Sequence, residues 1–406
     1  MPSLYTLEKD QNHDQLITLL RESDNATIRK RAAEIIGEIE SHKEATDALV
    51  GAVKSDENSS VRAAAIDALS NLEAVESLLR ALGKDVSNDG AQWAQAESFV
   101  SDLSDDEPEL RMAAANVLGQ LGNSTAARPL AQRLEVEPDP RVRARIIRAI
   151  GRVGEPSAAG VLVHSLQDEP LTIRREAADA LGNLGGETAL KGLLGIVGDE
   201  SEVIRRTTAS SLGQFGNEKP VDSLIALLSD ESDLVRRAAV FSLIEILSNV
   251  PPKRSHDLRE IIVDRMSATD DRSVVESLVE ILEEGMQTHQ RRNATWMLGR
   301  VAGEESQDLA ISALVEALAD SDDLVSQFAA TSLSEIGGRT VETALLDVLA
   351  DGTNEDAVAM AAFSLGRVGG DRAREQLQRL VDETESDEIR RRAFSSLSKL
   401  GSHGSV

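Results

Sequence analysis

Arginine and carboxylate side chains recur in this chain at a fixed distance from one another. Arg143, Arg174, Arg205 and Arg236 follow at intervals of 31 residues. Guanidinium groups form strong, charge-assisted hydrogen bonds with carboxylates, and a cation in the first turn of a helix needs compensation because it opposes the helix dipole. We therefore predict a structural Asp–Arg ladder. Its acids stand six residues before its arginines, in the pairs Asp56 and Arg62, Asp105 and Arg111, Glu137 and Arg143, Asp168 and Arg174, Asp199 and Arg205, and Asp230 and Arg236.

Residues that commonly carry catalysis are scattered. The six histidines form no HExxH zinc motif and no His-Glu dipeptide, and the chain has no phosphate-binding GxxxxGK(S/T) loop. The absence of cysteine removes disulfides, thiolate nucleophiles and Cys-bound metal centres. Acidic runs such as residues 102–109 lack the ligand spacing of an EF-hand loop. We therefore expect a protein that is not an enzyme and that holds no metal or cofactor.

A repeated segment of thirteen residues explains the arginine spacing. Segments 142–154, 173–185 and 204–216 align without gaps, and related segments begin at Ile28, Val61, Leu110, Val235, Gln290, Val325, Ala357 and Ile389. Apolar or small residues at positions 1, 5, 9 and 12 of the segment lie on one face of a helix, and a second apolar helix precedes it across an Asp-rich turn. Such a hairpin cannot bury its apolar face alone, so about eleven to twelve hairpins are expected to stack into an all-α superhelix.

The pattern VRxxAAxxLGxLG, preceded by a helix that ends in Asp, resembles the HEAT repeat family, specifically the short HEAT-like repeats first recognised in phycobilin lyases. The resemblance covers about residues 4–401 and implies a right-handed, ARM-like α-solenoid. Two irregular segments, around residues 84–107 and 249–290, interrupt the period. Two prolines in the second segment block a continuous helix, and they place a predicted boundary between repeat arrays 1–250 and 251–406. A longer loop between repeats is the alternative.

Positions 3, 7 and 11 of the segment lie opposite its buried face and are expected to line the concave groove of the solenoid. They hold eleven cations and six anions, whereas the whole chain has a net charge of −27. Exposed aromatic rings beside arginines commonly anchor protein interfaces. We predict a partner-binding groove formed by Arg175, Arg206, Arg237, Phe241, Arg292, Trp296, Arg300, Phe363, Arg367 and Arg391. Burial of these rings between neighbouring repeats is the alternative.

Acidic residues dominate the composition, with 70 Asp and Glu against 43 Lys and Arg, of which 34 are Arg. This charge repels nucleic acids and anionic membranes. It is typical of proteins from concentrated salt, where screening limits self-repulsion, so we infer a halophilic archaeal origin; an ordinary acidic bacterial protein is the alternative. No stretch approaches the roughly 18 apolar residues of a membrane span, and we expect a cytoplasmic protein.

The stacked hairpins favour a binding function over catalysis, because a solenoid exposes a long surface around little core. We expect an adaptor or scaffold whose groove binds a protein with an acidic or mixed surface, and no nucleic acid or small-molecule substrate. The resemblance implies one context, because haloarchaeal proteins with such repeats include members associated with taxis signalling to the archaellum. The alternative is a phycobilin-lyase-like chaperone or lyase for a tetrapyrrole, although no bilin-handling residue can be matched.

Overall fold

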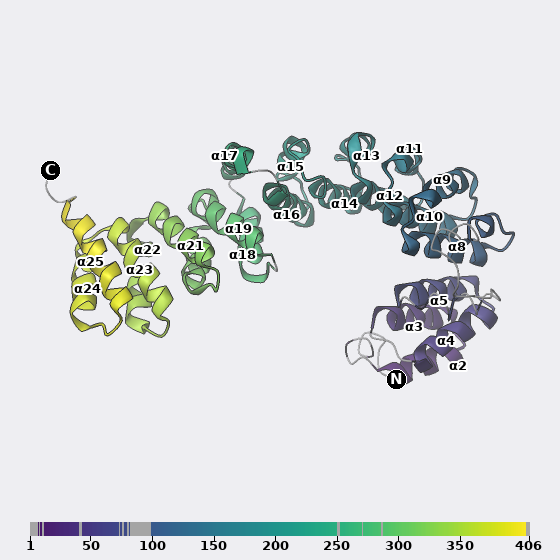
Figure 1. The fold of residues 1–406 in the computed structure, drawn as a ribbon, viewed down its shortest axis with the longest axis horizontal. Coiled ribbons are helices and arrows are strands. Elements are labelled where there is room, and N and C mark those ends of the chain that lie inside the picture. Colours follow the sequence, from purple (N-terminus) through teal and green to yellow (C-terminus); the bar gives the residue numbers. More distant parts are fainter. Residues whose placement is uncertain are drawn as a thin grey trace. The chain divides into compact units, whose positions relative to one another are not determined.

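The computed structural model describes residues 12–39, 43–72, 99–249, 252–269, 271–285 and 287–402, together with a few isolated positions before residue 82. These residues form helices joined by short turns, and the described part of the chain contains no strand (Figure 1). The predicted all-α class is confirmed. By their contacts the helices divide into two units, Met1–Ile196 and Val197–Val406. The boundary expected near residue 250, which concerned two repeat arrays, stays a prediction.

In the first unit, the second helix of each hairpin carries the repeated segment. The second helices are α3 (Ala26–Glu38), α5 (Ser59–Asn71), α8 (Pro108–Leu121), α10 (Pro140–Val153) and α12 (Leu171–Leu184). The first helices are α2 (His13–Glu22), α4 (Lys43–Ser55), α9 (Ala127–Val136), α11 (Ala159–Ser165) and α13 (Gly186–Leu194). Second helices pack on one another, as α10 does on α8 and α12, and first helices likewise, as α11 does on α13 (Figure 1). This pairing produces two layers.

The second unit repeats this plan. Its second helices are α14 (Glu202–Gly213), α16 (Asp233–Asn249), α19 (Thr288–Val301), α21 (Asp323–Ile336), α23 (Glu355–Val368) and α25 (Asp387–Ser402). Its first helices include α15 (Val221–Leu227), α20 (Gln307–Glu316), α22 (Gly338–Asp351) and α24 (Asp371–Glu383). No described helix of either unit is both long and apolar enough to cross a membrane.

The two irregular segments differ in what the structure describes. The segment around 249–290 holds two extra helices, α17 (Pro252–Thr269) and α18 (Arg272–Glu284), between α16 and α19. Helix α18 contacts α16, α19 and α20, so it continues the stack in place of an ordinary first helix. In the segment around 84–107, residues 84–98 lie outside the described residues.

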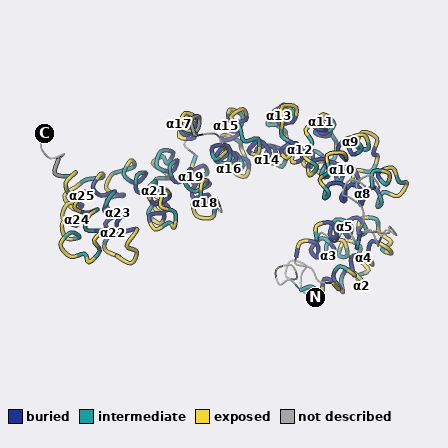
Figure 2. Tube along the Cα trace, viewed as in Figure 1, coloured by how far each residue is buried: buried dark blue, intermediate teal, exposed yellow. Residues whose placement is uncertain are grey.

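The apolar stripe of the repeated segment forms the core. In α12 the residues at positions 1, 5, 9 and 12 are Ile173, Ala177, Leu181 and Leu184, and all four are buried. Figure 2 shows buried stretches recurring along the helices of the stack. Turn chemistry fixes the helix ends: the Asp139 carboxylate accepts a hydrogen bond from the N–H group of Arg141 at 2.8 Å at the start of α10. Burial of this stripe supplies the main driving force of the fold.

Glycine at position 10 lets consecutive second helices approach closely. A Cβ atom added to Gly119 in α8 would lie 2.8 Å from the Cα atom of Ala149, which is position 8 of α10. The same pairing recurs between α23 and α25, where a Cβ atom on Gly366 would lie 2.5 Å from the Cβ atom of Ser396. The backbones therefore meet at a distance that excludes any side chain at position 10 of these helices.

We predict that Gly119→Ala destabilises the protein by about 1–3 kcal/mol, because the methyl group overpacks a rigid backbone contact. Gly51→Ala is the matched control, since it lies within α4 and a Cβ atom there would meet nothing within 4 Å. The control should stabilise the protein by about 0.5–1 kcal/mol through the higher helix propensity of alanine. Equal effects of the two substitutions in chemical denaturation would contradict the close-approach interpretation.

Candidate functional site

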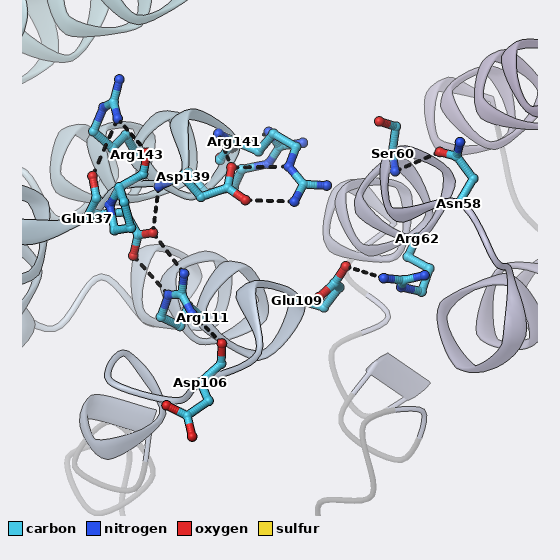
Figure 3. A network of polar contacts seen from close by, with 12 residues as sticks. Asn58, Ser60, Arg62, Asp106, Glu109, Arg111, Glu137, Asp139, Arg141 and Arg143 are labelled. Atoms are coloured by element: carbon cyan, nitrogen blue, oxygen red, sulfur yellow. Dashed lines mark hydrogen bonds and ion pairs between the residues drawn. The ribbon is translucent and has the colours of Figure 1, made fainter.

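Most ladder arginines bridge two turns rather than one, whereas Arg174, within the described residues, donates only to carbonyls of its own turn. Arg111 donates through Nε and Nη2 to the carboxylate of Glu137, both at 2.9 Å, and through Nη1 to the backbone carbonyl of Asp105 at 2.8 Å. Figure 3 shows Arg111 between Glu137 and Asp106, whose carbonyl accepts from the same Nη1 at 3.0 Å. Both carbonyls belong to the turn of the arginine's own repeat, and the carboxylate belongs to the next repeat. One planar guanidinium group therefore fastens neighbouring repeats together.

In most turns a backbone N–H group also fixes the acid. The Asp230 carboxylate binds Arg205 at 2.7 and 3.0 Å and accepts the N–H group of Ser232 at 2.9 Å. Burial would raise the pKa of Asp230, but the hydrogen bonds from Arg205 and Ser232 outweigh it and lower that pKa below its usual range. The carboxylate is therefore held ionised between its turn and the preceding arginine.

The pairs expected from a six-residue spacing are joined through the backbone, while the carboxylates of four of these acids bind the arginine of the preceding repeat: Asp56, Glu137, Asp168 and Asp230. Arg62 donates to the carbonyl of Asp56 at 2.8 Å, whereas the carboxylate of Asp56 binds Arg29 at 2.8 and 2.9 Å. The same backbone contact joins Arg111 to Asp105, Arg143 to Glu137, Arg174 to Asp168, Arg205 to Asp199 and Arg236 to Asp230.

The ladder adapts where the period is irregular. Arg62 binds the carboxylate of Glu109 at 2.7 Å, beyond the longer connection between α5 and α8. Arg236 in α16 binds Asp271, at the start of α18, at 3.0 Å. The carboxylate of Asp105 accepts the N–H group of Glu107 at 2.9 Å, and that of Asp199 accepts the N–H group of Ser201 at 2.8 Å. At the two irregular junctions the ladder arginine therefore binds an acid at the start of the next described second helix, α8, or of the inserted helix α18, whereas Asp105 and Asp199 cap their own turns.

The three position-7 aromatic rings all lie under cations in the second unit. The Cζ atom of Arg300 lies 4.1 Å from the centre of the Trp296 ring. Arg367 covers Phe363 at 4.6 Å, and Arg237 lies 5.7 Å from the centre of Phe241. Phe241 is 38% exposed, and the other two rings are half-buried. The rings therefore present a part of their surface together with a guanidinium group.

Three cations of the expected groove are engaged with acids of neighbouring helices. Arg292 binds Asp322 at 2.8 and 2.5 Å, and Arg300 binds Glu335 at 2.6 Å. Arg237 forms an ion pair with Glu280. Glu280 and Asp322 lie outside positions 3, 7 and 11, so the count of groove charges from sequence missed them. The positive surface is consequently smaller than that count implies.

The remaining groove arginines are more accessible. Arg206, Arg367 and Arg391 are exposed, and within the described part of the chain none of them forms an ion pair. Arg391 donates only to the backbone carbonyl of its own turn, at Asp387. Arg175 lies in the first unit, where it binds Glu176 at 2.9 Å. The residues expected in one groove therefore belong to two units, and the second unit contains all of them except Arg175.

Two layers of stacked helix hairpins, joined by an arginine ladder, define an α-solenoid repeat protein. The family model for HEAT repeats matches residues 14–98, 96–178, 127–209, 165–244, 192–283, 275–359 and 342–406. The chain therefore belongs to the HEAT repeat family, as its repeated segment predicted.

Similar proteins come from an archaeon, from design and from a cyanobacterium. The chain is 60% identical over 404 residues to a HEAT repeat-containing taxis protein of Halobacterium salinarum, with 99% of each chain covered. Among solved structures, an engineered protein matches 96% of this chain and 99% of its own at 20% identity, with a TM-score of 0.44. The complex of CpcE and CpcF of phycocyanin lyase from Nostoc sp. matches 62% of this chain and 94% of that chain at 20% identity, with a TM-score of 0.39.

We predict that Arg205→Ala destabilises the second unit by about 3 kcal/mol, because it leaves a buried carboxylate without its cation. The side chains of Arg205 and Asp230 are only 9% and 8% exposed. Arg272→Ala is the control, since its ion pair with Glu276 lies on the surface and such pairs contribute about 0.5 kcal/mol or less. Urea denaturation monitored by circular dichroism measures both changes. If Arg205→Ala lowers the free energy of unfolding no more than Arg272→Ala does, the ladder contributes little to stability.

The ladder and its neighbouring pairs also predict acid sensitivity. The hydrogen bonds from Arg292 lower the pKa of Asp322 to about 2, whereas an unfolded aspartate titrates near 3.9. The stabilisation from this carboxylate is therefore present above about pH 4 and is lost as the pH falls toward 2. We expect the free energy of unfolding to fall over this interval, and Asp322→Asn to make that fall shallower. An unchanged pH profile in the variant would contradict this assignment.

Proposed function

We propose that this HEAT repeat protein is a non-catalytic adaptor in taxis signalling to the archaellum. The observation that carries the proposal is the 60% identity, over 99% of both chains, to a protein named for taxis. A match of this extent includes the turns and second helices of every repeat. The adaptor role is supported by the solenoid fold, in which charged side chains largely join repeat to repeat and leave a long surface for other proteins.

We place the binding surface on positions 3, 7 and 11 of the second unit. Its anchors are Phe241, Trp296 and Phe363, whose rings combine apolar area with a stacked cation. Aromatic and arginine side chains contribute most of the energy in typical interface hot spots. Arg206, Arg367 and Arg391 are cations that remain available to a partner, because all three are exposed and none forms an ion pair among the described residues. This chemistry fits an acidic segment of a partner protein, or one of mixed charge.

The test uses substitutions that spare the contacts between repeats. We expect the combined variant Arg206→Glu, Trp296→Ala and Arg367→Glu to lose at least nine-tenths of the partner recovered by affinity purification from native cells in molar KCl. Arg339→Glu is the matched control: this exposed arginine in α22, a first helix, should leave recovery unchanged. Circular dichroism checks that both variants fold.

The identity of the recovered protein tests the taxis part of the proposal. A response regulator or a motor component should co-purify with the wild-type chain and be lost with the combined variant. Recovery of unrelated proteins alone would contradict the taxis role. Equal recovery of the partner with the combined variant and with Arg339→Glu would contradict the proposed position of the binding surface. If cells that carry the combined variant swim at normal speed but show impaired taxis, the binding surface is required for the taxis role.

A further inference from the structure

Position 6 of the repeated segment faces the next second helix. In the second unit, the Ser242 hydroxyl of α16 donates to the carbonyl of Ala209, position 6 of α14, at 2.9 Å. Ser332 of α21 makes the same contact with Thr295, position 6 of α19, at 3.0 Å. In the ten second helices before α25, from α3 to α23, the side chain at position 6 is fully buried.

Helix α25 departs from this rule. Its position 6 is Phe394, and 67% of this residue is exposed. A repeat face that no further repeat covers is ordinarily polar. A phenylalanine there instead presents a large apolar surface on the side that stacks a following repeat elsewhere in the chain, and no described helix covers it.

The other parts of the repeat contact are present beside Phe394. Arg390 occupies the ladder position, and its side chain is 43% exposed, whereas Arg29, Arg111 and Arg205 are at most 15% exposed. It binds the carbonyl of Thr384 in its own turn, as ladder arginines do, and its ion pair is with Asp387 of its own helix. At position 10, Ser398 is small and exposed, and α21, which has Ser334 at that position, still packs on α23. The face therefore has the three features of an interface between repeats: a guanidinium group at Arg390, an apolar side chain at Phe394 and a small residue at Ser398.

The charge of α25 indicates what this face accepts. The helix carries Arg390, Arg391, Arg392 and Lys399 against Asp387 and Glu388. Of these cations only Arg390 lies at positions 2, 6 and 10, and a second copy would bring the same arginine to the same face. An acidic helix matches it better, because a carboxylate can take the place that the acid of the following repeat occupies beside Arg111 or Arg205.

We propose that the exposed face of α25, formed by Arg390, Phe394 and Ser398, is a docking site for an acidic amphipathic helix of another protein, which stacks as an additional second helix would. This site goes beyond the proposed groove, because positions 2, 6 and 10 form it rather than positions 3, 7 and 11. The partner helix carries a carboxylate at its N-terminal turn to meet Arg390. A small residue further along it meets Ser398.

The chain itself supplies a defined probe for this site. A peptide of residues 320–337 contains four acids and no Lys or Arg. In the intact protein this segment stacks on α19, where Asp320 binds the ladder arginine Arg291 at 3.1 Å and Ser332 packs against Gly299. The peptide therefore has the surface that complements a ladder helix.

The experiment titrates the fluorescein-labelled peptide with the full chain in molar KCl, up to millimolar protein, and follows fluorescence anisotropy. We expect saturable binding that Phe394→Asp weakens at least tenfold. Arg390→Gln and the peptide change Asp320→Asn should each weaken binding about threefold, and together no more than either alone, because they remove the same contact. Val136→Asp is the matched control, since Val136 in α9 is 68% exposed, and it should leave the affinity unchanged.

Three outcomes would overturn the proposal. These are no binding to the wild-type chain, equal loss with Val136→Asp, or a dimer in sedimentation velocity that Phe394→Asp abolishes, which would make the face a contact between copies. Trp296→Ala keeps the two proposals apart: it should leave peptide binding unchanged, and loss of binding with Trp296→Ala but not with Phe394→Asp would assign the peptide to the groove.

Discussion

The stack depends on a guanidinium group that binds two turns at once. In Arg111 one nitrogen is held by the carbonyl of Asp105, and the opposite edge of the same rigid plane then faces the carboxylate of Glu137. The flexible ammonium of a lysine offers no comparable fixed edge, because its three donors rotate freely about one atom. This geometry explains why arginine rather than lysine recurs at the ladder position in a chain that has 43 cations of both kinds.

The close approach of second helices supports the same junctions independently. Helix α21 has Ser326 where the ladder arginine would stand, yet α23 still packs against it. The Ser364 hydroxyl of α23 donates to the carbonyl of Ala330 at 2.9 Å in a buried contact. Small residues at positions 8 and 10 therefore hold the helices together where the ladder is interrupted. The ladder fixes the turns at one end of the helices, and the small residues fix their middles.

The periodicity of the sequence was sufficient to predict the helices and the buried stripe at Ile173 and Leu181. It could not assign each acid to its arginine. A spacing of six residues suggests a contact within the repeat, but the turn directs the carboxylate of Asp56 toward Arg29, and only its carbonyl toward Arg62. The groove charge was overestimated for a related reason: Glu280 reaches Arg237 from the irregular helix α18, which has no place in the repeat register.

The two kinds of surface differ in how salt affects them. At an ionic strength near 1 M the Debye length is about 3 Å, so exposed cations such as Arg206 attract a distant partner only weakly in the medium that the composition predicts. Ladder pairs such as Arg205 and Asp230 are buried and are screened much less. In concentrated salt the binding energy must therefore come from buried apolar area and from polar contacts at hydrogen-bonding distance, because long-range attraction is screened. In the two proposed sites Trp296 and Phe394 supply that area, so the proposals rest on aromatic rings more than on net charge.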